Sequence, residues 1–352
     1  MEKQVKIFER QIGRIGRDSN PVFKNYRQNS EPAAFRAIRT VSECLGPNGD
    51  AKNGARQQWL AYCKMLNKKS HINSYRSNRF NNLYDGANYV LIHKNDIIDF
   101  LNNHICDPNL KLKSVLCDLS CEKVYTHIVC LAAIGRYVTS PFWNLVNSNE
   151  HYLDLYKFFN PLYKRMKSWT ENCNIIFDGE IDPYILKYPH KIDDSYNILL
   201  QELKKVKDTG TEIFCIMCTS ITRVMERQLA DFLSEGIYSK EASEEDKKNI
   251  AHAKITNIPA ENLFGDLDYA IKRKHNASVF HHSSIVMLKR NKTVHWLKKK
   301  PDHVKCKIMA IGRKYANLCK NKANKLEQEV SKKRQNILRD NKQKKNTQAE
   351  KN

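Results

Sequence analysis

Apolar residues that recur every three or four positions are the feature that most constrains this fold. In residues 30–46, SEPAAFRAIRTVSECLG, one side of a helix would carry Phe35, Ile38, Val41 and Leu45. Ser30 is typical of a helix start and Gly46 of a helix end. A helix with one apolar side has to bury that side against a neighbour. The stretch therefore predicts a helix that packs into a core.

The same helical period returns along most of the chain. It predicts further helices over residues 5–15, 56–66, 121–138, 151–169, 195–210 and 212–236, with Gly210 and Gly236 ending the last two. Two short apolar runs, 87–93 (ANYVLIH) and 172–179 (NCNIIFDG), are candidate strands. We therefore expect a mainly α protein, without a glycine-rich phosphate loop or an internal repeat.

Charge separates the end of the chain from the rest. The 352 residues carry a net charge of +22, which indicates an anionic partner, with nucleic acid the first candidate and an acidic membrane surface the second. Residues 298–352 hold 18 Lys and Arg against 5 Asp and Glu, so +13 of that charge lies there. Within this tail, residues 331–345 (SKKRQNILRDNKQKK) are typical of a solvated helix or a disordered basic arm.

The tail supplies the candidate DNA-binding residues. They are Lys298, Lys299, Lys300, Lys332, Lys333, Arg334, Lys342, Lys344 and Lys345. Two functional interpretations of this stretch are a nuclear-import signal and a phosphate-binding tail, and a solvated helix face is the structural alternative. Lysine and arginine attract phosphates without reading a base sequence, so we expect nonspecific DNA binding.

Apolar length and cysteine count set further expectations. No run of about 18 apolar residues is present and the N-terminus lacks a signal-peptide core, so we expect a soluble, unexported chain without a membrane partner. The 11 cysteines are then expected to be reduced. Cys215 and Cys218 form a CxxC inside an apolar helical stretch, and the group Cys117, Cys121, His127 and Cys130 also follows a helix pattern, so no metal site is predicted.

Glu261 is the one acidic residue that invites a catalytic interpretation. It stands two residues after Pro259, at the expected start of a helix, where a carboxylate favours the positive end of the helix dipole. Leu263, Leu267 and Ile271 then follow at helical spacing. A helix cap accounts for Glu261 without any chemistry.

Two stretches resemble the hAT superfamily of DNA transposases. Residues 77–91, SNRFNNLYDGANYVL, resemble the TRWNSTY segment that precedes the large helical insertion of that family. Residues 256–274, TNIPAENLFGDLDYAIKRK, are similar to its S-x-x-E-R-x-F-S segment, which holds the last catalytic glutamate. The order of the two agrees with the family, and the resemblance covers roughly residues 31–297.

The resemblance implies a partial RNase H-like α/β transposase fold, interrupted by a helical insertion domain. In the family, three carboxylates hold two divalent ions that cut and join DNA. Carried over by position, Glu261 is the third carboxylate and Phe264 its core neighbour, while Arg79 and Asn81 match the family's Arg and Asn, and Phe80 replaces Trp.

The chain departs from this pattern where the metal site should form. The family's first two aspartates have no counterpart, because the acidic residues of the first 30 positions are Glu2, Glu9 and Asp18 in a basic context. One carboxylate cannot hold a pair of catalytic ions, so we expect no enzyme activity and no cofactor. Mg²⁺ or Mn²⁺ would be needed only if an acidic triad were completed elsewhere.

The sequence therefore predicts four segments. They are a basic amphipathic segment at 1–30, a helical insertion-like region at 31–255, a transposase-like segment with Glu261 at 256–297 and a basic tail at 298–352. The leading hypothesis is a truncated or domesticated, inactive, nuclear transposase-like protein that binds DNA through its tail. The alternatives are an active transposase completed by missing N-terminal acids, and a helical RNA-binding or scaffold protein. A homo-oligomer is left open, because Trp296 is either a subunit contact or a core residue.

Overall fold

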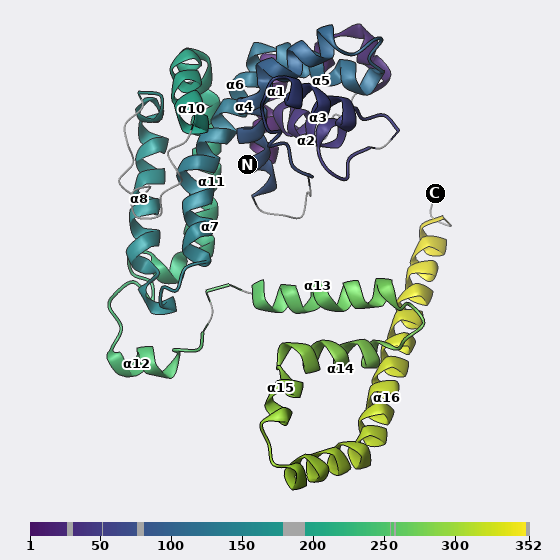
Figure 1. Ribbon diagram of the computed structural model, residues 1–352. Coiled ribbons are helices and arrows are strands. Elements are labelled where there is room, and N and C mark those ends of the chain that lie inside the picture. Colours follow the sequence, from purple (N-terminus) through teal and green to yellow (C-terminus); the bar gives the residue numbers. More distant parts are fainter. Residues whose placement is uncertain are drawn as a thin grey trace. The chain divides into compact units, whose positions relative to one another are not determined.

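The computed structural model describes residues 1–26, 31–50, 52–75, 81–178, 194–253, 255, 256 and 258–349. These residues divide into two compact units, Met1–Ile255 and Thr256–Asn352. Figure 1 shows that both units are built from helices. The expectation of a mainly α protein is confirmed. No described helix is long and apolar enough to cross a membrane.

The first unit begins with an N-terminal segment, made of α1, η1 and η2, which is followed by the helices α2, α3 and α4. Their bounds are α1 Glu2–Ile12, η1 Gly16–Ser19, η2 Pro21–Tyr26, α2 Ala33–Leu45, α3 Arg56–Met65 and α4 Asn82–Asn103. Val5 and Phe8 of α1 are buried in the main core. The first 26 residues are therefore an integral part of this unit, whereas the sequence suggested a segment of their own.

The rest of the first unit is also helical. Its elements are α5 Leu110–Ser120, α6 Glu122–Ile134, η3 Gly135–Thr139, α7 Ser140–Val146, η4 Tyr152–Asp154, α8 Tyr156–Glu171, η5 Cys173–Ile176, α10 Asp194–Lys205, α11 Lys207–Gln228, η6 Ala230–Phe232 and α12 Glu244–Asn249. α6 packs against α2, α4 and α11, and α11 also packs against α8. All thirteen residues of α6 except Glu122 and Lys123 are buried, so this helix forms the centre of the core.

Both candidate strands are wrong, because the described residues contain no strand. Residues 87–93 lie inside α4, where Ala87, Val90 and Leu91 bury one side of a helix. The run beginning at Asn172 forms the short 3₁₀ turn η5. Helix packing on α6 and α11 therefore overrides the β propensity of these residues. The RNase H-like sheet that the resemblance implies has no counterpart in the described residues.

Gly210 is the second local correction. We expected it to end a helix, but α10 ends at Lys205 and Gly210 lies in the first turn of α11. A Cβ atom at this position would lie 3.1 Å from Phe177 Cε1 and 3.3 Å from Thr126 Cγ2. The missing side chain thus lets α11 approach its neighbours closely, which sequence cannot distinguish from a helix stop.

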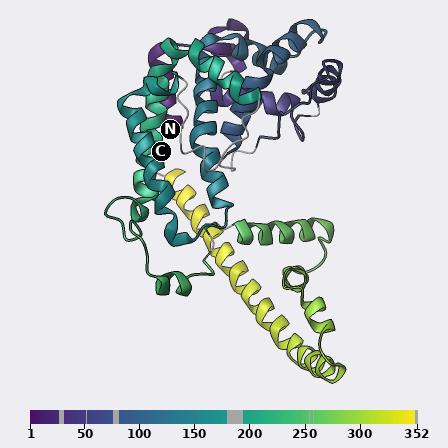
Figure 2. The ribbon, with the colours of Figure 1, turned by 60° about the vertical axis from the view of Figure 1, so that its left-hand side comes forward.

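The second unit contains α13 Ile258–Arg273, α14 Val279–Arg290, α15 Thr293–Lys298 and α16 Asp302–Ala349. α13 packs on α14, and α14 on α15. Figure 2 shows α16 as one continuous rod. His282 and Val286 are the buried side chains of this unit among the residues whose burial is described. Unlike the first unit, it has almost no interior of its own.

Candidate nucleic-acid interface

α16 presents basic side chains to solvent over most of its length. Lys332, Lys333 and Arg334 are exposed in its middle. Among its described side chains, Lys305 is the one cation in an ion pair, with Asp302 at 2.9 Å. Cations without a carboxylate partner keep their full charge available to a polyanion. Lys342, Lys344 and Lys345 lie in the same helix, but their side chains fall outside the described residues.

Three lysines connect α15 to α16. Lys298 ends α15, and Lys299 is exposed. Lys300 Nζ lies 5.1 Å from the centre of the Trp296 ring. Trp296 itself is 47% exposed. It is therefore not a core residue, and this pair places a flat aromatic surface beside a positive charge.

Three of the residues that carried the transposase resemblance, Asn81, Glu261 and Phe264, are among the described residues. Glu261 lies in the first turn of α13, as the cap interpretation expects. Phe264 is 68% exposed, so it is not the core neighbour that the resemblance implies. Asn81 lies directly before α4, with its Oδ1 buried and without a hydrogen-bond partner. Arg79 lies outside the described residues.

The acidic neighbours of Glu261 on α13 are engaged with basic side chains. Asp266 accepts a hydrogen bond from Arg290 at 2.6 Å, and Asp268 accepts one from Lys272 at 2.7 Å. The described residues contain no group of three or more His, Cys, Asp or Glu side chains arranged to hold a metal ion. What α13 offers is an exposed helix with surface ion pairs.

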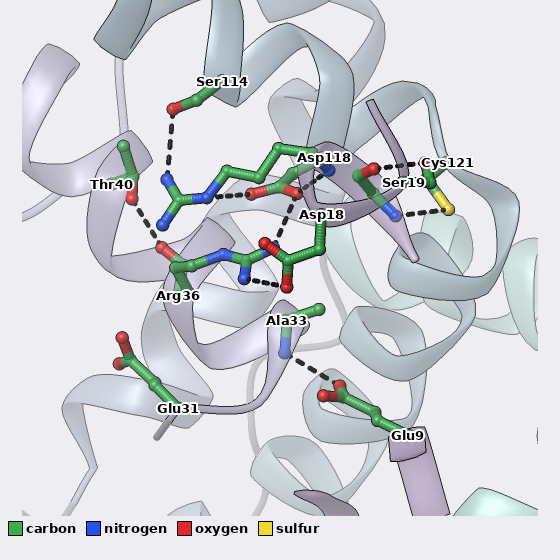
Figure 3. A network of polar contacts seen from close by, with 12 residues as sticks. Glu9, Asp18, Ser19, Glu31, Ala33, Arg36, Thr40, Ser114, Asp118 and Cys121 are labelled. Atoms are coloured by element: carbon green, nitrogen blue, oxygen red, sulfur yellow. Dashed lines mark hydrogen bonds and ion pairs between the residues drawn. The ribbon is translucent and has the colours of Figure 1, made fainter. Parts of the chain in front are cut away.

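Two arginines of the first unit, Arg17 and Arg36, are in contrast buried and used internally. Figure 3 shows Arg36 between Asp18 and Asp118, at 2.7 and 3.1 Å. Arg17 donates its backbone N–H to Asp118 Oδ1 at 2.8 Å and a guanidinium N–H to Ser114 Oγ at 3.2 Å. Burial acts to lower the pKa of Arg36, but Asp118 and Asp18 outweigh it and the pKa is raised. Arg36 therefore stays charged, and its charge is unavailable to a ligand.

This buried ionic network joins the N-terminal segment to α2 and α5. Gly16 makes the approach possible, because its φ is +58° and a Cβ atom there would lie 2.3 Å from Asp118 Oδ1. Glu9, which is 3% exposed, accepts the backbone N–H of Ala33 at 2.8 Å and so caps α2. The sequence reasoning did not find this network, because its partners lie far apart in the chain.

A groove beside α4 is a further feature that sequence reasoning missed. It has a volume of about 500 Å³, and its wall includes Asp85, Tyr89 and His93. Burial raises the pKa of Asp85 to about 6. His93 accepts the backbone N–H of His71 at 3.2 Å and contacts Asp96 at 3.4 Å. His93 thus holds His71, and with it the loop before α4, against that helix. Its contacts with His71 and Asp96 are structural.

Of the two cysteines of the CxxC, Cys218 lies inside the core and Cys215 is half-buried at its edge. Cys218 is fully buried, and burial raises the pKa of its thiol. Burial also raises the pKa of Cys173 to about 12. Thiols in such surroundings are protonated at neutral pH and unreactive. They act as small apolar residues that fill the space between α8 and α11.

Comparison with known proteins gave no match: no family model, no curated protein and no solved structure is similar to this chain.

Proposed function

We propose that this protein is a non-catalytic, transposase-like nuclear protein that binds duplex DNA nonspecifically through α16. The observation that carries the proposal is the exposed basic surface of α16, whose described Lys and Arg side chains, apart from Lys305, have no carboxylate partner. A helix with free cations along many turns can follow the phosphates of a duplex. The transposase part of the proposal comes from the resemblance around Asn81 and Glu261, and the RNase H-like sheet is not included in it.

The binding test is a titration with duplex DNA at several salt concentrations. The variant Lys332→Gln/Lys333→Gln/Arg334→Gln removes three exposed cations from α16. We expect the slope of log K against log salt to fall by about 3, since each lost phosphate contact removes close to one released counterion. A chain ending at Leu297 should lose most of its affinity.

The matched control neutralises three exposed lysines of the first unit, Lys64→Gln/Lys123→Gln/Lys167→Gln. This variant has the same change in net charge, but it leaves α16 intact. We expect its salt slope to stay close to that of the wild type. Equal slopes for both triple variants would mean that net charge alone drives binding, and would contradict a site on α16.

Catalysis is tested on the same DNA with Mg²⁺ or Mn²⁺. We expect no nicking, since Glu261 is a single exposed carboxylate at a helix start. Metal-dependent nicking that Glu261→Gln abolishes would instead support an active transposase completed by acids outside this chain. Nuclear entry is tested by fusing residues 331–345 to a fluorescent protein.

A second candidate function is an RNA-binding or scaffold protein unrelated to transposases. The absence of a strand among the described residues favours it, because the resemblance implies a sheet. Competition separates the two proposals. Single-stranded RNA that displaces duplex DNA from α16 at equal nucleotide concentration would favour the second candidate, while weak displacement would favour the first.

A further inference from the structure

One side of α16 carries an apolar row that two lysines interrupt, which we call the apolar seam. Its members are Val304, Ile308, Ile311, Tyr315, Cys319, Leu326, Val330 and Ile337. Consecutive seam positions are three or four residues apart and repeat every eleven residues, with Lys322 and Lys333 at the two polar positions. Eleven residues make just over three full helical turns, so the row runs nearly straight along the helix.

The apolar seam is exposed from Ile311 to Ile337, while Val304 and Ile308 are half-buried. Ile311 is 58% exposed, Leu326 is 61% and Ile337 is 57%. An apolar row of this length on a soluble chain marks an interaction surface. The seam also affects the stability of α16, because most helical stability in proteins comes from packing an apolar side rather than from helix propensity. α16 contains three Asn-Lys pairs and Gly312. Asn and Gly are weak helix formers, so little in this sequence would hold α16 as an isolated helix.

The charges of α16 decide which occupant fits. In a parallel pair of α16 helices, Lys322 would face Lys322 of the second copy within the seam, and Lys333 would face Lys333. Glu327 would also approach Glu329 of the second copy. Like charges at these positions oppose pairing. In an antiparallel pair centred between Lys320 and Asn321, every one of these clashes is removed.

The antiparallel register places each polar seam position against an uncharged one. Lys322 lies level with Cys319 of the second copy, and Lys333 lies level with Ile308. Glu329 comes within two residues of the level of Lys314, which lies on the same flank of the apolar seam and carries the opposite charge. Apolar pairs remain at the other levels, such as Tyr315 with Leu326 and Ile311 with Val330.

We propose that α16 pairs with α16 of a second copy of this chain, antiparallel, through the apolar seam. Most Lys and Arg residues of the helix lie outside the seam, so pairing leaves them exposed. The proposal does not rest on DNA binding, and salt separates the two. Salt weakens the binding of phosphates, whereas it strengthens a contact between two positively charged helices by screening their repulsion.

The test is sedimentation of the full chain without DNA at rising salt. We expect a dimer of the 41.1 kDa chain, with an affinity that increases with salt. Ile311→Asp/Leu326→Asp should raise the dimer Kd at least 100-fold, because it places charges in the seam. Met309→Asp/Leu338→Asp changes two exposed apolar residues about a third of a turn away from the seam and should leave the dimer intact.

Orientation is tested with a spin label on Cys306, which is exposed, after Cys106→Ser and Cys319→Ser remove the other exposed thiols. An antiparallel pair puts the two labelled positions roughly 44 Å apart along the helix axis, at about 1.5 Å per residue. Labels within about 20 Å would mean a parallel pair, which overturns the proposal. A monomer at every salt concentration, or seam variants that still dimerise, would overturn it as well.

Discussion

The two units differ in whether their arginine and apolar side chains are buried or exposed. In the first unit, Arg36 is fully buried between Asp18 and Asp118, and the apolar side chains share a common interior. In the second unit, Arg334 and Leu326 are both exposed. The difference is that the first unit encloses a shared apolar core and a buried ionic network, while the second leaves most of its apolar and basic side chains exposed. The first unit is therefore held by its own interior, whereas the second has almost no interior to hold it.

The largest expected effect is on the buried ionic network of the first unit. Asp118→Ala leaves Arg36 and Arg17 as buried charges with too few partners, which costs about 3–5 kcal/mol of unfolding free energy. Urea unfolding measures it. The control is Lys332→Ala on exposed α16, which should change stability by less than about 0.5 kcal/mol. A loss below about 1 kcal/mol for Asp118→Ala would show that the network does not hold the unit together.

Substituting a glycine in each unit should give a difference in stability of intermediate size. Gly210→Val would push side-chain carbons against Phe177, and overpacking of this kind costs about 1–3 kcal/mol. At Gly265 of α13 a Cβ atom would meet nothing within 4 Å, so Gly265→Val should change stability by less than about 0.5 kcal/mol. Thermal unfolding of both variants checks the pair, and similar losses at the two sites would remove the contrast.

The smallest effect is a pH dependence located at Asp85. Burial raises its pKa in the folded protein to about 6, so folding favours the protonated carboxyl. That stability is fully present below the pKa of the unfolded chain, about 4, and is lost as pH rises through 6. Asp85 is half-buried, so solvent limits the loss to on the order of 1–2 kcal/mol.

The variant Asp85→Asn isolates this effect. Between pH 4 and 7 the wild type should lose stability relative to Asp85→Asn, measured by urea unfolding at each pH. Asp268→Asn on α13 is the comparison, because Asp268 is 64% exposed and pairs with Lys272 at the surface. A constant difference between the wild type and Asp85→Asn across this range would show that the groove does not favour the protonated carboxyl.

Part of the fold could be predicted because it depends on residues close together in the chain. The helical period around Phe35 and Ile38 identified α2, and the lysine-rich composition identified the tail. The two strands failed for a physical reason. A short apolar run such as the one containing Val90 and Leu91 fits a strand or a buried helix equally well, and only its neighbours decide between them.

The candidate site could also be predicted only in part. Exposure of Lys332 and its neighbours follows from composition, whereas Phe264 and Trp296 are as apolar as any core residue and their exposure cannot be read from the sequence. The network of Arg17, Arg36 and Asp118 was missed because its members are 82 and 101 residues apart. The one available signal was Asp118 itself, a carboxylate among the apolar residues of α5.

The sequence by itself thus determined the helices and the concentration of positive charge at one end, because both depend on local spacing and composition. The tertiary structure decided which charged side chains are buried in ion pairs and which remain exposed to solvent. Arg36 and Arg334 are the same side chain with the same intrinsic charge. Burial beside Asp118 makes Arg36 a structural residue, whereas none of the described elements of the second unit covers Arg334, which is exposed.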